Sequence, residues 1–391
     1  MAPKGFLFSA VEAAIKKPGR KDLALIYSQV EAAVAGTFTT NTVKAAPVQL
    51  DMKRIGSGRG QAIVINSGNA NACTGKKGLQ DADEMTRLIA NNLNIEPSLV
   101  YICSTGVIGT PLPMERIRPK ISELIENLGR STMKDVASAI MTTDTFPKIV
   151  RRKIKIGSKM GTIAGMCKGA GMIWPNMATM LCYIMTDIAI NQKTLDKVLN
   201  DAVRKSFNRI TVDGDRSTND TVLIMANGIL GNPQVTEKSG PYTTFKKSLY
   251  EVTSELSRLI VKDGEGATKL VEIEVKGAAS EADAERAVFS VANSSLVKTA
   301  LYGNDANWGR IMAALGYSGV HIKEEKIDIY FGDIKVTDRG IGTGRDKEAN
   351  RVLKGKNIKI IIDLRLGRSS AKILTCDLTE DYVRVNAAYR T

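Results

Sequence analysis

The middle of the chain reads Lys168-Gly-Ala-Gly-Met-Ile-Trp-Pro-Asn-Met-Ala-Thr-Met-Leu-Cys-Tyr-Ile-Met-Thr-Asp187. Two glycines near its start allow the backbone to bend tightly, and Pro175 fixes φ and prevents a continuous helix through the bend. The apolar run after Thr179 is typical of a buried strand. The segment predicts a strained connection that ends with Thr179 at the start of this strand, where the small Ala178 leaves its carbonyl group accessible. The same residues are also compatible with an ordinary loop before a core strand.

On both sides of this segment, signals for strands and helices alternate, which indicates an α/β or α+β protein. Gln61–Ile65 reads as a buried strand that runs into a polar, glycine-containing turn at residues 66–71. Apolar residues at helical spacing predict helices around residues 85–93, 117–128, 195–203 and 249–260.

The length of 391 residues predicts two domains, because single cores seldom grow beyond about 250 to 300 residues. The polar stretch Gly277–Ala282 is the candidate boundary. We therefore expect a main domain over residues 1–277 and a smaller α/β domain over residues 278–391. The smaller domain is expected to contain a helix near residues 283–299 and strands near 326–331, 356–364 and 371–377.

The net charge of +14 does not indicate a nucleic-acid partner, because 55 basic residues are scattered among 41 acidic ones and aromatic residues make up only 5%. The densest basic run, Lys148–Lys155, partly alternates with apolar residues like an exposed strand face. No apolar run reaches the roughly 20 residues of a membrane-spanning helix. With no export signal at the amino terminus, we expect a soluble, cytoplasmic protein.

The five cysteines are odd in number and show no C-x-x-C spacing, which argues against a disulfide framework and a zinc site. Glycine clusters such as Gly340–Gly344 lack the spacing of dinucleotide- or phosphate-binding loops. The sequence thus predicts no metal and no bound cofactor.

A single histidine, His321, makes Ser-His-Asp or Cys-His catalysis a poor fit to this chain. An acyl-transfer or hydrolytic enzyme of this kind needs another base that titrates near neutral pH. An α-amino group, with a pKa of about 7.7 to 8.0, is suitable.

The segment at residues 168–187 closely resembles the processing site of the ornithine acetyltransferase family of arginine biosynthesis, called ArgJ. Further segments resemble signatures of this family, in the family's order and over nearly the whole chain. They are Thr39-Thr-Asn41 with Lys44-Ala-Ala-Pro47, Asn66-Ser-Gly-Asn-Ala-Asn-Ala-Cys-Thr-Gly75, Ser104-Thr-Gly-Val-Ile-Gly109, Thr142-Thr-Asp144, Asp213-Gly-Asp215 with Ser217-Thr-Asn-Asp220, Asp263-Gly-Glu-Gly-Ala-Thr-Lys269, Gly303-Asn-Asp-Ala-Asn-Trp-Gly-Arg310 and Asn386-Ala-Ala-Tyr-Arg-Thr391.

The resemblance implies that the chain cuts itself between Ala178 and Thr179 into an alpha chain, 1–178, and a beta chain, 179–391. The Thr179 hydroxyl would be the nucleophile and its freed amine the base. An acetyl group would pass from N2-acetylornithine to Thr179 and then to glutamate, in a ping-pong reaction. Some family members also acetylate glutamate from acetyl-CoA, and no residue here distinguishes the two types.

By the same resemblance, the Thr105 hydroxyl and the Gly106 backbone N–H form an oxyanion hole, in which one donor is typically worth about 3 to 4 kcal/mol. The residues expected to contact the substrates are Thr142, Lys168, Thr179, Glu265, Asn386 and Thr391. A cationic Lys168 suits a substrate carboxylate, and Glu265 suits an amino group. Trp174 departs from the family, in which a smaller or polar residue is more usual.

The resemblance also implies a layered α-β-β-α sandwich with a smaller carboxyl-terminal domain, and an assembly of two alpha and two beta chains. Two other functions remain compatible with the residues. One is an amidase or aminopeptidase with the same threonine nucleophile, in which water is the acceptor. The other is a basic nucleic-acid-binding protein that is not cut and whose binding weakens steeply with salt.

Overall fold

The computed structural model describes residues 2–174 and 180–388. The chain forms two compact units. The first comprises the described parts of Met1–Gly169, Pro175–Asn208 and Arg216–Ile260, and the second comprises those of Ala170–Trp174, Arg209–Asp215 and Val261–Thr391.

The first unit is built on an eight-stranded sheet in the order β4-β3-β2-β8-β7-β6-β5, with β1 paired to β2. Its strands are β1 (Phe6–Val11), β2 (Leu23–Phe38), β3 (Arg59–Asn69), β4 (Val100–Val107), β5 (Lys148–Ile156), β6 (Lys159–Lys168), β7 (Leu181–Thr186) and β8 (Thr221–Ala226). Its helices are α1 (Ala46–Arg54), α2 (Gly75–Leu93), α3 (Met114–Ile117), α4 (Ile121–Glu126), α5 (Met133–Ala139), α6 (Gln192–Lys205) and α7 (Tyr242–Lys262).

The long strand β2 joins the two layers of this unit. Its pairing with β3 jumps from Tyr27 to Ala32 while β3 moves only from Ala62 to Gly60, which is an irregularity of the kind that bends a strand. The first half of β2 pairs with β1 and its second half with β8. One apolar core unites side chains from β1–β4 with side chains from β6–β8, so the two halves of the sheet pack face to face.

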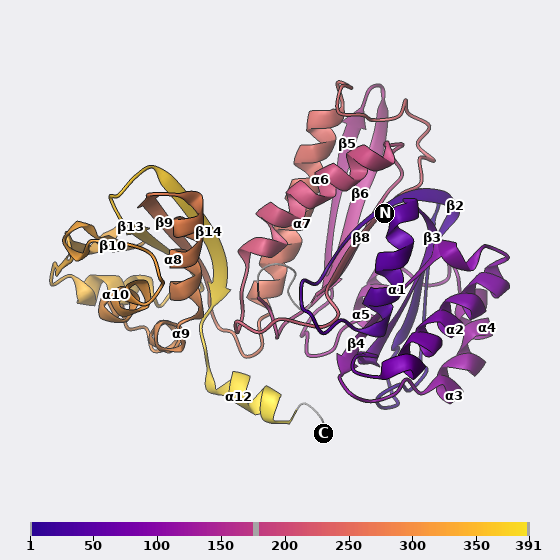
Figure 1. The fold of residues 1–391 in the computed structure, drawn as a ribbon, viewed down its shortest axis with the longest axis horizontal. Helices are drawn as coiled ribbons and strands as arrows, with labels where there is room; N and C mark the ends of the chain where they lie inside the picture. The colour runs from indigo at the N-terminus through magenta and orange to yellow at the C-terminus, as the bar shows by residue number, and fades with distance from the viewer. Residues whose placement is uncertain (1, 175–179, 389–391) are drawn as a thin grey trace. The chain divides into compact units, whose positions relative to one another are not determined.

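Helices cover both outer faces of this sandwich. Apolar side chains of α2, α3 and α4 pack with those of β3 and β4 in a second core. On the other side, α6 and α7 lie along β5, β6 and β8 (Figure 1). The predicted α-β-β-α architecture is therefore confirmed.

The bend in β2 gives the sandwich two distinct ends. We call the end where both termini of β2 lie the open end; β3 and β4 finish there, and β7 and β8 start there. We call the opposite end, where β7 and β8 finish, the bend end.

Three sequence predictions in this unit can be compared with the structure. The apolar run after residue 180 is β7, buried at every position, as predicted. The strand predicted at Gln61–Ile65 continues to Asn69, because its parallel pairing with β4 extends through Gly68. The basic run is strand β5, as predicted, but Lys148 is fully buried, not exposed, because it pairs with Asp144.

The second unit contains a six-stranded sheet in the order β12-β11-β10-β13-β9-β14. Its strands are β9 (Leu270–Ala278), β10 (Asp328–Phe331), β11 (Ile334–Asp338), β12 (Ile341–Gly342), β13 (Asn357–Asp363) and β14 (Ser369–Cys376). Its further helices are α8 (Glu281–Asn293), α9 (Ser295–Tyr302), α10 (Trp308–Gly316), α11 (Asp346–Val352) and α12 (Glu380–Ala387). The single helix predicted near residues 283–299 is two helices, because Ser294 is extended and caps α9 by accepting from the Val297 N–H.

The expected domain boundary at residues 277 and 278 differs from the boundary between the compact units. Strand β9 lies between β13 and β14 and pairs with both, so it belongs to the second unit. The polar stretch at residues 277–282 is the connection from β9 to α8 within that unit.

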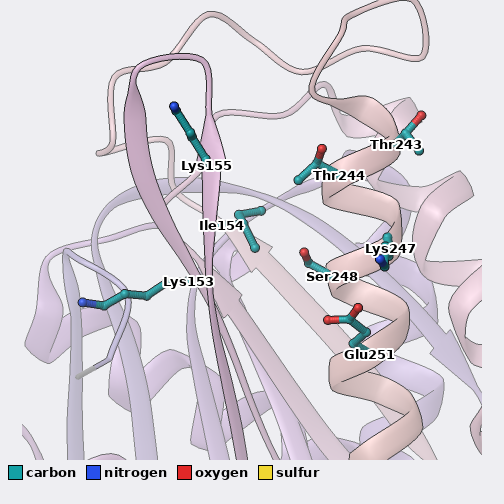
Figure 2. Close-up of a pocket in the computed structure, with 8 residues that line it drawn as sticks. All are labelled: Lys153, Ile154, Lys155, Thr243, Thr244, Lys247, Ser248 and Glu251. Carbon is teal, nitrogen blue, oxygen red and sulfur yellow. The ribbon is translucent and has the colours of Figure 1, made fainter.

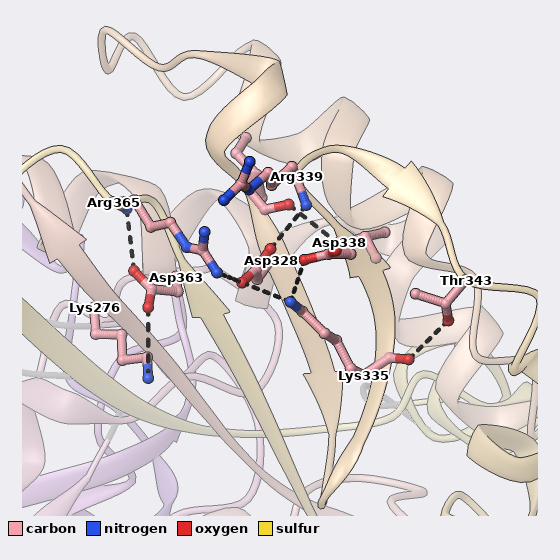
Figure 3. A network of polar contacts seen from close by, with 10 residues as sticks. Lys276, Asp328, Lys335, Asp338, Arg339, Thr343, Asp363 and Arg365 are labelled. Atoms are coloured by element: carbon pink, nitrogen blue, oxygen red, sulfur yellow. Dashed lines mark hydrogen bonds and ion pairs between the residues drawn. The ribbon is translucent and has the colours of Figure 1, made fainter.

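A network of charged side chains lies at the end of this second sheet where β10 begins and β11 and β13 finish (Figure 3). Asp328 is 1% exposed and accepts from the Arg339 N–H at 2.8 Å and from Lys335 Nζ at 3.0 Å. Arg365 also pairs with Asp328, which joins β10, the end of β11 and the end of β13. The Asp328 carboxylate therefore has a structural role, since it connects three neighbouring strands.

The remaining composition-based expectations concern isolated side chains. Cys103, Cys167, Cys182 and Cys376 are buried, whereas Cys73 is exposed. His321 is exposed and lies outside the strands. Over residues 2–174 and 180–388, no helix is both long and apolar enough to cross a membrane.

Candidate active site

The predicted site residues fall into three groups. Thr105, Gly106, Thr142 and Lys168 are in the first unit, and Glu265 and Asn386 are in the second. Ala178, Thr179 and Thr391 lie outside the described residues.

Thr105 and Gly106 lie at the open end, near the last residue of β4. Thr105 is buried, and Gly106 has a φ of +138°. A Cβ atom on Gly106 would lie 2.2 Å from the carbonyl carbon of Gly68 and 2.4 Å from the backbone nitrogen of Asn69. Only glycine therefore fits where β3 and β4 approach each other.

Asn219 ties this strand end to the other layer of the sandwich. Its Nδ2 donates to the carbonyl oxygen of Ser104 at 2.8 Å and to that of Ala70 at 2.6 Å. The Ser104 hydroxyl donates in turn to Asn66 Oδ1 at 2.6 Å. Asn219 stands within a segment that resembles a family signature, but the sequence alone predicts no role for it.

Asp220, the next residue, anchors the start of β7. Its Oδ1 accepts from the Met180 N–H at 2.9 Å, and the Thr221 N–H donates to the Met180 carbonyl at 3.1 Å. Burial raises the pKa of Asp220 well above its usual value, against the lowering effects of the Met180 N–H and the Lys168 charge. Among the described residues, its buried Oδ2 has no hydrogen-bond partner.

Thr142 and Lys168 are brought together through Asp144, for which the sequence alone predicts no role. Thr142 is half-buried in the loop before β5, and Lys168 is the buried last residue of β6. Asp144 Oδ2 accepts from the Thr142 N–H at 3.1 Å, and Oδ1 accepts from the Gly169 N–H at 2.7 Å. Burial raises the pKa of Asp144, but the nearby Lys168 and Lys148 charges and the Gly169 N–H outweigh it and lower the pKa to about 2.

Glu265 and Asn386 meet in the second unit. Asn386 Nδ2, on α12, donates to Glu265 Oε2 at 2.7 Å. The Glu265 N–H donates to the Ala170 carbonyl at 2.9 Å, so this glutamate is also tied to the segment that follows Lys168. The two described residues of this unit that are predicted to contact substrate are therefore neighbours.

Asp213 holds the segment that leads into the predicted cleavage site. Its carboxylate accepts from the N–H groups of Met172 at 2.6 Å and Ile173 at 2.9 Å. Burial raises its pKa to about 6, despite these hydrogen bonds. Trp174, the predicted departure from the family, stacks on Phe289 of α8 with ring centroids 6.0 Å apart. Its bulk is accommodated by packing within the second unit.

A pocket of about 380 Å³ lies between β5 and α7, towards the bend end (Figure 2). None of the predicted site residues lines it; the lining residues are Lys153, Ile154, Lys155, Thr243, Thr244, Lys247, Ser248 and Glu251. Ile154 faces the helix, whereas Lys153 and Lys155 point to the other side of the strand. Within residues 2–174 and 180–388, no three His, Cys, Asp or Glu side chains are grouped to hold a metal ion.

Known proteins resemble this chain over its whole length. The model of the ArgJ family matches residues 7–391. The arginine biosynthesis bifunctional protein ArgJ of Geobacter sulfurreducens is 56% identical, over 100% of both chains. The protein of the same name from Caldanaerobacter subterraneus subsp. tengcongensis is 50% identical, over 100% of this chain and 98% of its own.

A solved structure is also similar. The arginine biosynthesis bifunctional protein argJ from Bacillus halodurans is 44% identical, with a TM-score of 0.51. The match covers 53% of this chain and 98% of that chain.

Proposed function

Because this chain belongs to the ArgJ family, we propose that it moves an acetyl group from N2-acetylornithine to the amine of glutamate through an acetyl ester of Thr179. The chain is an acyltransferase of arginine biosynthesis. The donor, the acceptor, the nucleophile and the self-cleavage are the finer parts of the proposal.

One observation supports the proposed nucleophile and oxyanion hole. Two consecutive residues, Asn219 and Asp220, bind the Ser104 carbonyl and the Met180 N–H. Ser104 precedes the predicted oxyanion hole, and Met180 follows the predicted nucleophile. The sheet therefore attaches the neighbours of both predicted catalytic groups to the same short segment.

Maturation begins when Thr179 Oγ attacks the Ala178 carbonyl carbon. The C–N bond breaks as the ester forms, and the nitrogen gains a proton to become the free amine of Thr179. Water then hydrolyses the ester and releases the carboxylate of Ala178. The 98% match of the Bacillus halodurans chain to only 53% of this chain supports such a division, since either predicted fragment is close to half of the whole.

The mature enzyme would use the freed amine as the base for its own hydroxyl. Thr179 Oγ attacks the acetyl carbonyl of N2-acetylornithine, the amide C–N bond breaks, and ornithine leaves with the proton on its amine. The amine of glutamate then attacks the acetyl ester, and Thr179 Oγ recovers a proton. In both halves, the Thr105 hydroxyl and the Gly106 N–H would stabilise the negative acetyl oxygen.

The substrate contacts extend this scheme. Lys168 would bind a substrate carboxylate, and Glu265 with Asn386 would bind an amino group. Thr142 and Thr391 complete the proposed set. The scheme requires no bound cofactor.

Acetyl-CoA is proposed as a second acetyl donor, because the relatives from Geobacter and Caldanaerobacter are named bifunctional. We further propose an assembly of two alpha and two beta chains, located in the cytoplasm.

The decisive experiment is the intact mass of the purified protein under denaturing conditions, beside Thr179→Ala. We expect two masses for the wild type, divided between Ala178 and Thr179, and one full-length mass for the variant. A full-length wild type that nevertheless transfers acetyl groups would overturn the proposed nucleophile.

Activity is then measured with N2-acetylornithine and glutamate, and separately with acetyl-CoA and glutamate. Release of acetate in place of N-acetylglutamate would instead make water the acceptor. Acetyl transfer only from acetylornithine would restrict the enzyme to the exchange reaction.

A further inference from the structure

The Asp144 carboxylate joins three pieces of the chain at the open end of the sandwich. Its Oδ2 accepts from the Thr142 N–H at 3.1 Å, in the loop between α5 and β5. Its Oδ1 accepts from Lys148 Nζ at 2.6 Å, at the first residue of β5, and from the Gly169 N–H at 2.7 Å, just after β6. One side chain thus connects a loop and the ends of two strands.

The environment favours an ionised and immobile carboxylate. The side chains of Asp144 and Lys148 are both 0% exposed. A buried charge is tolerated only when it is paired and hydrogen-bonded, and Asp144 has one cationic and two backbone donors. Lys148 Nζ also lies 5.0 Å from the centre of the Phe146 ring, which adds a second favourable contact for the cation.

The two backbone donors belong to positions that need an external restraint. Gly169 has a φ of +152° and no side chain with which to fix the backbone after Lys168. The loop before β5 has no regular hydrogen-bond ladder from residue 141 to residue 147, although Arg20 binds the Met141 carbonyl at its start. Asp144 supplies the restraint for both.

We propose that Asp144 is a positioning residue that holds Thr142 and Lys168 at the separation that the amino-acid substrate requires. The inference rests on the proposed function, in which these two residues bind the substrate. Displacements of about 1 Å from a productive geometry cost on the order of 100-fold in rate, so a side chain that fixes two binding residues has a measurable effect without touching substrate.

Asp187 provides a matched control at the bend end of the sandwich, where it directly follows β7 and binds β6 through Thr162. It is 1% exposed, and it also accepts two backbone N–H groups, from Thr162 at 2.8 Å and from Lys4 at 3.2 Å. It therefore matches Asp144 in burial and in joining separate pieces of chain, but among the described residues it contacts none of the proposed site residues.

The test compares Asp144→Asn and Asp187→Asn in the mature enzyme, with the wild type. We expect Asp144→Asn to raise the KM for N2-acetylornithine at least tenfold, because the amide has one acceptor oxygen where the carboxylate has two. The kcat is expected to fall less than KM rises. Asp187→Asn is expected to keep KM within about twofold while its thermal midpoint falls. A wild-type KM in Asp144→Asn, or equal KM changes in both variants, overturns the inference.

A second measurement covers a variant that does not fold. In the wild type, hydrogen exchange of the Thr142 and Gly169 amides should report a common opening, since one carboxylate holds both. Protection factors that differ more than tenfold overturn the inference. Hydrogen exchange does not depend on activity, so it tests whether Asp144 is a positioning residue. The acetyl-transfer assay of the wild type separately tests the proposed function.

Discussion

The two ends of the sandwich in the first unit carry similar residue types in different physical states. At the open end, Lys148, Lys168, Asp144 and Asp220 are buried. At the bend end, Lys153, Lys155 and Lys159 are exposed. The buried lysines distinguish the open end, since burying a charge is costly and is typical of a reactive site.

Buried carboxylates occur at both ends, so burial alone does not mark the site. Asp187 at the bend end uses its oxygens on the Thr162 and Lys4 backbone. Asp144 and Asp220 instead bind the neighbours of residues proposed to act on substrate. The chemistry of the surrounding residues distinguishes the open end.

The largest effect is expected from Gly106→Ala at the open end. The new Cβ would lie 2.2 Å from the Gly68 carbonyl carbon, so the two strand ends must separate and the proposed oxyanion donor moves. We expect acetyl transfer to fall at least 100-fold, as for loss of one such donor. Gly240→Ala is the control, since a Cβ there meets no atom within 4 Å. Equal activity in both variants would remove Gly106 from the site.

The Asp144 ion pair predicts a pH dependence of stability. The pKa of Asp144 is lowered from 3.8 to about 2 in the folded protein, so its stabilising contribution is present above about pH 4 and is lost as the pH falls towards 2. The contribution is about 2 kcal/mol. Thermal unfolding of the wild type and Asp144→Asn between pH 3 and pH 7 should show a difference that shrinks in acid. A difference in stability that stays constant from pH 7 to pH 3 would contradict the lowered pKa of Asp144.

A smaller effect is expected from Asp220→Ala. The change leaves the Met180 N–H without its buried acceptor, at a cost of about 1 to 3 kcal/mol. We expect self-cleavage to slow about tenfold, followed by intact mass over time after synthesis. Asp220→Asn keeps an acceptor oxygen and should cleave faster than Asp220→Ala. Equal rates for wild type and Asp220→Ala would show that this contact does not assist cleavage.

The smallest effect is expected from Lys155→Ala near the bend end. This lysine is exposed and points away from α7, so we expect KM and kcat within twofold of the wild type. Stability should change by no more than about 0.5 kcal/mol, measured by thermal unfolding. A large loss of activity would contradict the assignment of the active site to the open end alone.

Much of the fold could be predicted from local pattern. The buried strand after Thr179 and the strand at Gln61–Ile65 follow from short apolar runs, and both exist. The domain boundary could not be predicted in this way. The alternation of Leu270–Val275 predicts a strand but does not indicate its neighbours, and only the pairing with β13 and β14 assigns β9 to the second unit.

The candidate site was predictable only in part. Thr105, Gly106, Lys168 and Glu265 came from the family resemblance. Asp144, Asn219 and Asp220 lie within segments that resemble family signatures, but nothing in the sequence indicates which polar groups they bind. Those contacts join residues such as Ser104 and Asn219, which are 115 positions apart.

The sequence by itself determined the family, the succession of strands and helices, and the residue types available for acyl transfer, because these depend on local periodicity and on motif order. Only the tertiary structure decided which charges are buried. Lys148 and Lys155 stand in one basic run, yet one is enclosed beside Asp144 and the other is in water. The physical reason is that burial and pairing are set by segments distant in the chain, whose contacts no single stretch of sequence contains.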